Sequence, residues 1–474
     1  MLDNNQLNSI GFRWVAEHVE VMTPYGEALL RRPRFYSRAE KDELICEQHN
    51  IEALREAVRG STAGVNALMR LLMPIKDVRR SIDSLEMRTL SEVELFEVKR
   101  FLLQLELIAP QLESLSLGLH GITIVSLPKA LDLIDPDGTR SPSFYVSDRL
   151  SERLASIRRE RRRVDERIKL EGLSDELQFE RTRLAAQEEQ ENARVRGELC
   201  EKLRCYRPVL LENAASIGRL DLALGKARLA EAFGAVMPKF SERFVMRGMK
   251  NPKFAEALEA KGRGFVPVTL ELVKGSVVIT GANMGGKSFA IKTLALNCVL
   301  AMCGFAVFAQ EAELPFLDDV FILSEDKEDA LSGLSSFGGE MKAFDAMLRS
   351  TAEARAVLVL LDEFARGTNP HEGAALVRAA ARLFNGRNNT FAVIATHFDG
   401  VARLARLHYQ VAGLRNADAA SIRSRIAASG SDALAEFMDY GLYPVSPDEE
   451  PPRDAVTIIH ALGVSGEFTD LIDI

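Results

Sequence analysis

The sequence predicts a mixed fold, in which an all-α core and lever domain with a helical hairpin arm precedes an α/β domain. Up to about residue 240, apolar residues recur at helical spacing and strand signals are few. From about residue 264, short apolar runs alternate with helical stretches, as in a largely parallel sheet. A glycine-rich loop, GANMGGKS, stands at 281–288 between one such run and a helix. We therefore predict one domain over 1–240 and a second over 241–474.

Composition narrows the classes of protein. The 474 residues allow more than one core, and the formal charge of −8 argues against a protein that holds nucleic acid by bulk positive charge. The longest apolar run, 294–309, is shorter than the about 20 residues of a membrane span, and we interpret it as a buried helix leading into a buried strand. The cysteines form no CxxC pair and no secretory signal precedes them. We expect a cytoplasmic protein with reduced thiols and no membrane partner.

The helical arm is predicted from a seam of apolar residues. After Leu150, the seam positions alternate in steps of four and three, as in a coiled coil, with one interruption at Arg161. Gly172 then breaks the pattern, and Ser174 with two following acidic residues has the character of a new helix start. The sequence therefore predicts an antiparallel coiled-coil hairpin over about 150–200, whose first helix is about 30 Å long.

The arm carries a cluster of arginines, which allows two interpretations. The cluster is a phosphate-contacting patch, or it is a solvated helix face balanced by acidic neighbours. The second interpretation is favoured because the neighbouring carboxylates would dilute any field on DNA. The arginines are Arg158, Arg159, Arg161, Arg162 and Arg163, and the acidic neighbours are Glu152, Glu160, Asp165 and Glu166.

The glycine-rich loop is typical of a phosphate-binding loop of the P-loop NTPase type. Glycines let backbone N–H groups curl around phosphates, and the following helix N-terminus adds partial positive charge. Lys287 is predicted to reach the β and γ phosphates, and the hydroxyl of Ser288 to bind Mg²⁺. The predicted nucleotide-binding residues here are Gly281, Ala282, Asn283, Met284, Gly285, Gly286, Lys287, Ser288 and Phe289.

Two later strands end in residues that suit the same chemistry. The run AVLVLLDE ends in Asp362, predicted to contribute to the Mg²⁺ shell, and Glu363, predicted to polarise an attacking water. The run FAVIATH ends in His397, which we interpret as a γ-phosphate sensor. Together with Lys287, Glu363 and His397 form the predicted catalytic set. In the stretch 333–341, GLSSFGGEM, Ser335 and Ser336 indicate only a helix cap when judged from the residues alone.

The second domain contains, in this order, TGANMGGKS, LSSFGGEM, LLDEFARGTNPHEG and ATHFD. These motifs resemble the ABC-type ATPase domain of the MutS family of DNA mismatch repair proteins. Near the N-terminus, MTPYGEALLRR is similar to the opening of the MutS core, and FMDYGLYPV and AVTIIHALGV are similar to the strand and helix that close the ATPase domain. The resemblance covers most of the chain and is most specific between Gly281 and Phe398.

The resemblance implies a homodimer that binds ATP and Mg²⁺. In the family, two ATPase domains pair and the serine-rich signature of one subunit completes the site of the other. By resemblance, Ser335 and Ser336 would approach the γ phosphate held by the partner, and Gly367 and Thr368 would lie in the loop that links the two sites. ATP would close the dimer as a nucleotide-gated clamp.

Several features of the family's repair proteins are not found in this sequence. We find no mismatch-reading domain, no connector and little or no clamp at the arm tip. Phe254 and Glu256 match the letters of the mismatch wedge, but they lie just before the ATPase domain. The segments FVPVTLEL and SEDKEDALSG also depart from the family pattern, and Glu372 stands where Asp is usual.

Two functions from different classes therefore remain open. The first is a DNA-binding clamp ATPase, related to mismatch repair but not expected to read mismatches itself, that recognises a branched or distorted duplex by shape through the basic arm. The second is an accessory ATPase that remodels a protein partner, such as an adenosylcobalamin-dependent aminomutase. A structural protein that binds ATP without hydrolysis is a third alternative, and Lys287, Asp362 and Glu363 argue against it.

Overall fold

A computed structural model gives the structure of this chain. It describes residues 2–141, 143–281, 286–324, 336–414 and 439–449, with 422, 437, 459 and 466–469. The chain forms two compact units. The first comprises Met1–Val19, Arg34–Gln48 and Leu229–Ile474, and the second comprises Glu20–Pro33 and His49–Arg228. The division into 1–240 and 241–474 stays a prediction.

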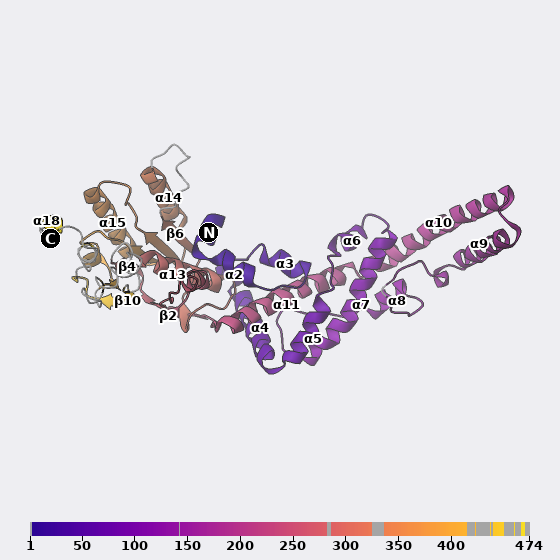
Figure 1. The fold of residues 1–474 in the computed structure, drawn as a ribbon, viewed down its shortest axis with the longest axis horizontal. Helices are drawn as coiled ribbons and strands as arrows, with labels where there is room; N and C mark the ends of the chain where they lie inside the picture. The colour runs from indigo at the N-terminus through magenta and orange to yellow at the C-terminus, as the bar shows by residue number, and fades with distance from the viewer. Residues whose placement is uncertain are drawn as a thin grey trace. The chain divides into compact units, whose positions relative to one another are not determined.

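The second unit is helical throughout its regular elements (Figure 1). Two of its helices, α4 and α11, continue into residues of the first unit. Its helices are α3 (Pro24–Leu30), α4 (Lys41–Gly60), α5 (Thr62–Leu72), α6 (Arg79–Ser84), α7 (Glu92–Ser114), α8 (Pro128–Ile134), η2 (Asp148–Leu150), α9 (Glu152–Glu171), α10 (Asp175–Arg204) and α11 (Arg207–Phe233).

Helices α9 and α10 form the predicted hairpin. Helix α9 ends at Gly172, whose φ of 87° lies in the left-handed region that glycine adopts readily. The hydroxyl of Ser174 accepts a hydrogen bond from the N–H of Leu177 and caps α10, as predicted. The two helices share an apolar seam of Ile157, Val164, Leu177 and Leu184. Burial of this seam holds the helices together.

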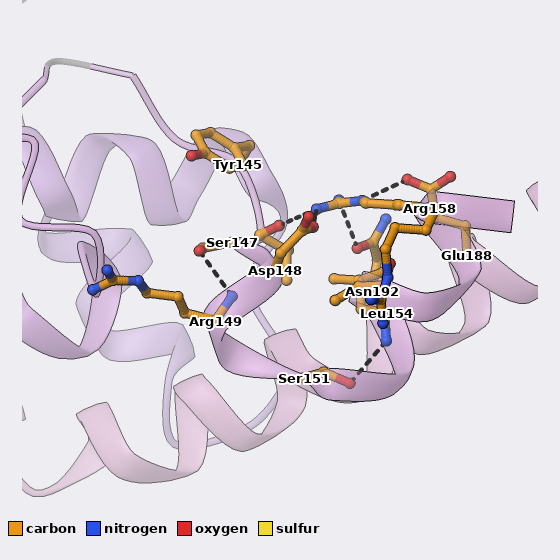
Figure 2. Close-up of polar contacts among 12 residues, drawn as sticks. Tyr145, Ser147, Asp148, Arg149, Ser151, Leu154, Arg158, Glu188 and Asn192 are labelled. Atoms are coloured by element: carbon orange, nitrogen blue, oxygen red, sulfur yellow. Dashed lines mark hydrogen bonds and ion pairs between the residues drawn. The ribbon is translucent and has the colours of Figure 1, made fainter. Parts of the chain in front are cut away.

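The base of the hairpin is held by a polar network around Arg158 (Figure 2). The guanidinium of Arg158 donates to Glu188 at 2.8 Å, to Asp148 at 2.7 Å and to the carbonyl of Val146 at 2.7 Å. It also donates to Asn192 at 3.3 Å. One side chain on α9 therefore joins α10 to the turn that precedes α9.

The same network bears on whether the arginine cluster is a phosphate-contacting patch or a face balanced by carboxylates. Arg161 also pairs with Glu188, and Arg162 lies 3.6 Å from Asp148. Burial alone would raise the pKa of Glu188, but hydrogen bonds from Arg158 and Arg161 outweigh burial and lower it. These arginines are thus balanced largely by carboxylates on α10 and in the preceding turn, rather than by their neighbours on α9.

The first unit contains two β-sheets and the helices packed around them. A four-stranded sheet has the order β1-β5-β2-β3, and a six-stranded sheet has the order β10-β9-β4-β8-β7-β6. The strands are β1 (Lys239–Phe240), β2 (Phe244–Met249), β3 (Val268–Leu272), β4 (Gly275–Thr280), β5 (Glu311–Leu314), β6 (Asp319–Ser324), β7 (Val357–Asp362), β8 (Thr390–Ala395), β9 (Leu407–Gly413) and β10 (Asp439–Val445). The helices are α1 (Asn4–Ile10), α2 (Phe12–His18), η1 (Arg38–Glu40), α12 (Pro252–Glu259), α13 (Lys287–Met302), α14 (Ser336–Ser350), α15 (Pro370–Asn385), η4 (Ala402–Leu404) and α18 (Gly466–Thr469).

The six-stranded sheet is parallel except for its edge strand β10, which pairs antiparallel with β9. Strands β4, β7 and β8 are the apolar runs that predicted a buried parallel sheet, and every residue in them is buried. Val359 and Leu361 of β7 pack in one core with residues of α14 and α15. This arrangement confirms the predicted mixture of a helical part and an α/β part.

The apolar run 294–309 differs from its prediction. Its first part is the buried end of α13, but its second part forms a loop with a single β-bridge at Val307 instead of a strand. Asn297, which interrupts the run, is fully buried, donates to the carbonyls of Lys250 and Thr293, and accepts from the N–H of Phe308. The Asn297 amide thus forms hydrogen bonds with backbone groups that a strand would otherwise pair with a neighbouring strand. Within the described residues, none of the helices is both long enough and apolar enough to span a bilayer.

Replacing Arg158 with methionine is expected to loosen the base of the arm. The change removes hydrogen bonds to Glu188 and Asp148 and should destabilise the docking of α9 by about 2 kcal/mol. Hydrogen exchange of the first turns of α9 measures the effect. Arg159→Met is the matched control, because the Arg159 side chain is exposed and bonds only to its own helix in the contacts described. Equal loss of protection in both variants would contradict this role for Arg158.

Candidate functional site

The predicted catalytic and metal-binding residues, all of which the structure describes, lie near the ends of strands β4, β7 and β8. Ile279 and Asp362 are both in register with Ala395, so the three strands finish at one edge of the sheet. The N–H of Glu363 donates to the carbonyl of Ala395 at 3.0 Å, and the N–H of Thr396 donates to that of Ile279, also at 3.0 Å. Carboxyl ends of parallel strands are the usual place for a ligand in such a sheet.

Lys287 is the first residue of α13 and is 3% exposed. Its ammonium donates to the carbonyl of Gly281 at 2.7 Å and lies 3.8 Å from a carboxylate oxygen of Glu363. Burial lowers the pKa of Lys287, and the negative charge of Glu363 acts in the opposite direction. The lysine is thus held over the start of the glycine-rich loop, as a phosphate-binding lysine requires.

Ser288 and Asp362 lie together beside the lysine. The hydroxyl of Ser288 donates to Asp362 at 3.0 Å, and Asp362 is 7% exposed. Burial raises the pKa of Asp362, and the hydrogen bond from Ser288 partly opposes this rise. A hydroxyl and a carboxylate are hard oxygen donors of the kind that Mg²⁺ prefers, so this pair suits the predicted metal.

Glu363 is held in an unusual backbone conformation. Its φ is 55°, and Ala365 two residues later has a φ of 60°, so both lie in the left-handed region that non-glycine residues avoid. The Glu363 carboxylate also pairs with Arg366. The tight turn after β7 therefore aims a carboxylate back toward Lys287, at a cost in backbone strain.

His397 lies two residues after the end of β8, with its side chain exposed. Partial loss of hydration lowers its pKa, while the charge of Glu363 acts to raise it. The imidazole is thus within electrostatic reach of the Glu363 carboxylate, and its ring centroid lies 4.5 Å from that of Phe398. A lowered pKa keeps the ring neutral at physiological pH, so it would act there as a hydrogen-bonding group.

Helix α14 contributes a residue that sequence reasoning missed. Both carboxylate oxygens of Glu340 lie 3.2 Å from the N–H of Ala365 and accept its hydrogen bond. The ring of Phe344 packs on that of Phe364 with centroids 4.8 Å apart. The helix that begins within the serine-rich motif is thus bonded to the turn that carries Glu363. Glu340 is in the quoted motif GLSSFGGEM, but nothing in its spacing indicates this contact.

A second missed residue is Tyr440 on β10. A Cβ atom placed on Gly286 would lie 3.0 Å from the Tyr440 ring, and the φ of Gly286 is 92°. Glycine is therefore required at the last turn of the phosphate-binding loop both by its backbone and by this neighbour. The adjacent strand β9 adds His408, whose imidazole hydrogen-bonds the hydroxyl of Thr280 at 2.8 Å. Strands β9 and β10 thus contact Thr280 and Gly286, which flank the described ends of the loop.

The remaining predicted residues have mixed outcomes. Ala282, Asn283, Met284, Gly285 and Ser335 lie outside the described residues, as does the side chain of Ser336, which opens α14. Phe289 is 44% exposed on α13.

Three residues outside the nucleotide set have structural contacts of their own. Phe254 packs against Phe289, and Glu256 accepts a hydrogen bond from Trp14 at 2.6 Å. Thr368 donates to Glu372 at the start of α15. Phe254 and Glu256, the two residues that match the mismatch wedge, thus make contacts within the first unit. The helix predicted over 455–464 falls almost entirely outside the described residues.

Comparison with protein families agrees with this geometry. The family model for MutS domain V matches residues 277–431, which include Lys287, Asp362 and His397. These residues thus form a MutS domain V. The DNA mismatch repair protein MutS of Thermus aquaticus is 34% identical over 216 residues, which is 44% of this chain and 26% of that protein. The MutS protein of Pseudothermotoga lettingae is 30% identical over 243 residues, or 50% of this chain and 29% of that protein.

A longer match is found with the MutS protein of Natronomonas pharaonis, which is 29% identical over 318 residues. It covers 65% of this chain and 34% of that protein. The alignments of these three curated MutS proteins thus cover about a quarter to a third of their own length.

Replacing Glu340 with alanine is expected to destabilise the turn after β7. The buried N–H of Ala365 would lose its acceptor, which costs about 1–3 kcal/mol. Thermal unfolding measures the loss. Glu340→Gln is the matched control, because its amide oxygen can still accept the bond. An alanine variant as stable as the parent chain would show that this bond contributes nothing.

Proposed function

We propose that this MutS-family chain is a Mg²⁺-dependent ATPase. The observation that carries the proposal is the meeting of Lys287, Ser288, Asp362 and Glu363 at one edge of the parallel sheet. A buried ammonium, a hydroxyl on a carboxylate and a second carboxylate are the groups that phosphoryl transfer to water requires. Chance packing of buried charges does not explain why all of them lie at the carboxyl ends of neighbouring strands.

Each residue has a separate role in the proposed reaction. Lys287 would neutralise charge on the β and γ phosphates, and Ser288 with Asp362 would hold Mg²⁺. The metal, when bound, neutralises charge on phosphate oxygens. Glu363 would accept a proton from the attacking water, with its carboxylate fixed by Arg366 and by the turn after β7. His397 would hydrogen-bond the γ phosphate as a neutral imidazole.

We further propose that two copies pair through the ATPase domains, here taken as 241–474, and act as a nucleotide-gated clamp. Ser335 and Ser336 would then complete the site of the partner. Support comes from the family resemblance and from the bond between Glu340 of α14 and the turn that carries Glu363. That bond gives the serine-rich segment a direct connection to the catalytic turn of its own subunit.

Lys287→Ala is expected to abolish ATP binding, because no other described residue places an ammonium over the loop start in the same way. Glu363→Gln is expected to bind ATP normally but to lower kcat by at least about a hundredfold. Binding and turnover can be measured by calorimetry and phosphate release. Sedimentation of the Glu363→Gln variant with ATP should show a dimer. Parental turnover by this variant would contradict the role of Glu363, and a persistent monomer would contradict the clamp.

For the target of the ATPase, we propose DNA, since the relatives are named DNA mismatch repair proteins. A protein partner, such as an adenosylcobalamin-dependent aminomutase, is the second candidate. One observation favours it, because Arg158 and Arg161 of the arm are already paired with Glu188 and the chain carries a net charge of −8. Nucleic-acid binding depends on arginines and lysines that are free to meet phosphates.

ATP hydrolysis with and without candidate partners separates these targets. If DNA is the target, mismatched or branched duplexes should stimulate turnover more than a matched duplex, and added salt should weaken the effect steeply. Purified aminomutase in its inactive cobalamin-bound form provides the second arm. Stimulation by the enzyme alone, with no response to any duplex, would overturn the DNA proposal.

A further inference from the structure

A buried histidine beside the phosphate-binding loop has no role in the proposed reaction. The imidazole of His408, on β9, is 3% exposed and contacts residues of two neighbouring strands. One ring nitrogen, Nε2, lies 2.8 Å from the hydroxyl of Thr280, the last residue of β4. The other, Nδ1, lies 2.9 Å from the carbonyl oxygen of Ser446, which directly follows β10. One ring therefore bridges the ends of β4 and β10.

The register of the sheet explains how one ring reaches both strands. His408 is paired with Val278 on β4 and with Val445 on β10. Thr280 lies two residues after Val278, so the side chains of these two residues point to the same face of the sheet. Ser446 follows Val445 directly, and Thr280 is 3% exposed. The bridge is thus a consequence of strand pairing in the interior of the domain.

The chemistry of the bonding groups fixes the direction of both hydrogen bonds. A carbonyl oxygen can only accept, so Nδ1 of His408 carries a proton and donates to Ser446. In the neutral ring, Nε2 is then an acceptor, and the hydroxyl of Thr280 donates to it. The bond to Ser446 therefore determines which way the Thr280 hydroxyl points.

Thr280 stands at the point where β4 gives way to the phosphate-binding loop. Pairing of β4 with β8 ends at Ile279, one residue earlier. Gly281 follows with a φ of 136°, and a Cβ atom on it would lie 3.1 Å from the Cβ of Val411. The carbonyl of Gly281 accepts the 2.7 Å hydrogen bond from the buried ammonium of Lys287. The backbone just after Thr280 therefore determines where the ammonium is held.

We infer that Thr280 and His408 are positioning residues, which hold the Gly281 carbonyl, and through it the Lys287 ammonium, where phosphates bind. This inference rests on the proposed function. Neither residue has to touch the nucleotide. Because the bridge acts through the lysine, its loss should weaken contact with phosphates and leave contacts with the rest of a nucleotide unchanged.

Thr280→Val tests the inference, because valine keeps the branched shape and removes only the hydroxyl. Affinity for a non-hydrolysable ATP analogue with Mg²⁺ should fall by about two- to tenfold, the range for one hydrogen bond. Affinity for inorganic tripolyphosphate should fall by the same factor, since the effect acts on the phosphates. Thr280→Ser retains a hydroxyl and should have parental affinities. Calorimetry on the full chain gives these values.

The matched control is Ser276→Ala, near the opposite end of the same strand. Ser276 is fully buried, and its hydroxyl donates to the side chain of Asn385 at 3.0 Å. This variant also loses a buried hydrogen bond, so its unfolding temperature should fall, as for Thr280→Val. Its affinity for both ligands should equal that of the parent chain, because β4 begins far from the loop.

Two substitutions of the histidine separate the bonds made by its ring. In His408→Asn, the amide can replace Nδ1 and keep the bond to Ser446, but it is too short to reach Thr280. In His408→Gln, the amide oxygen can replace Nε2 and accept from Thr280. His408→Asn should therefore lower both affinities as Thr280→Val does, and His408→Gln should lower them less.

The outcomes are distinguishable. Parental affinities in Thr280→Val and His408→Asn, or an equal loss of affinity in Ser276→Ala, would show that the bridge only stabilises the fold and would overturn the inference. A loss confined to the ATP analogue would also overturn it, because the lysine acts on phosphates. Failure of the parent chain to bind either ligand would instead overturn the proposed function.

Discussion

The burial of the Lys287 ammonium is the constraint around which the site is organised. A buried charge is tolerated only when it is paired and hydrogen-bonded, and Lys287 meets this condition through the Gly281 carbonyl and the nearby Glu363. Glu363 reaches that position only because the chain turns sharply after β7. The turn after β7 is itself stabilised by Glu340, whose carboxylate accepts a hydrogen bond from the N–H of Ala365. The geometry of three segments distant in sequence thus follows from one buried cation.

The α/β part of the fold was predictable because its signals are local. Apolar runs and the loop GANMGGKS each indicate their own structure within a few residues, and parallel strands must end at a common edge. The sequence alone could therefore predict that the functional side chains lie together, namely Lys287, Ser288, Asp362 and Glu363. The pairing of α9 with α10 was predictable for the same reason, since Gly172 and Ser174 mark the turn between them.

Contacts between segments distant in sequence were not predictable. Glu188 balances Arg158 and Arg161 from 30 and 27 residues away. The prediction considered only acidic residues close to the arginines in sequence, and it therefore named other carboxylates. Tyr440 on β10 lies close to Gly286 although the two residues are far apart in sequence, and no spacing rule connects them. The buried strand expected after α13 was replaced by a loop, since the Asn297 amide can satisfy backbone groups that a strand would otherwise pair.

The left-handed backbone at Glu363 sets thermal stability against activity in this turn. A side chain with positive φ costs on the order of 1 kcal/mol, and glycine would remove that cost. Selection of variants for heat resistance alone would therefore favour glycine at 363 and would discard the carboxylate at the same step. A more stable but inert protein is the expected product of such a screen. Engineering of this chain for robustness should leave the turn after β7 strained and seek its gains elsewhere.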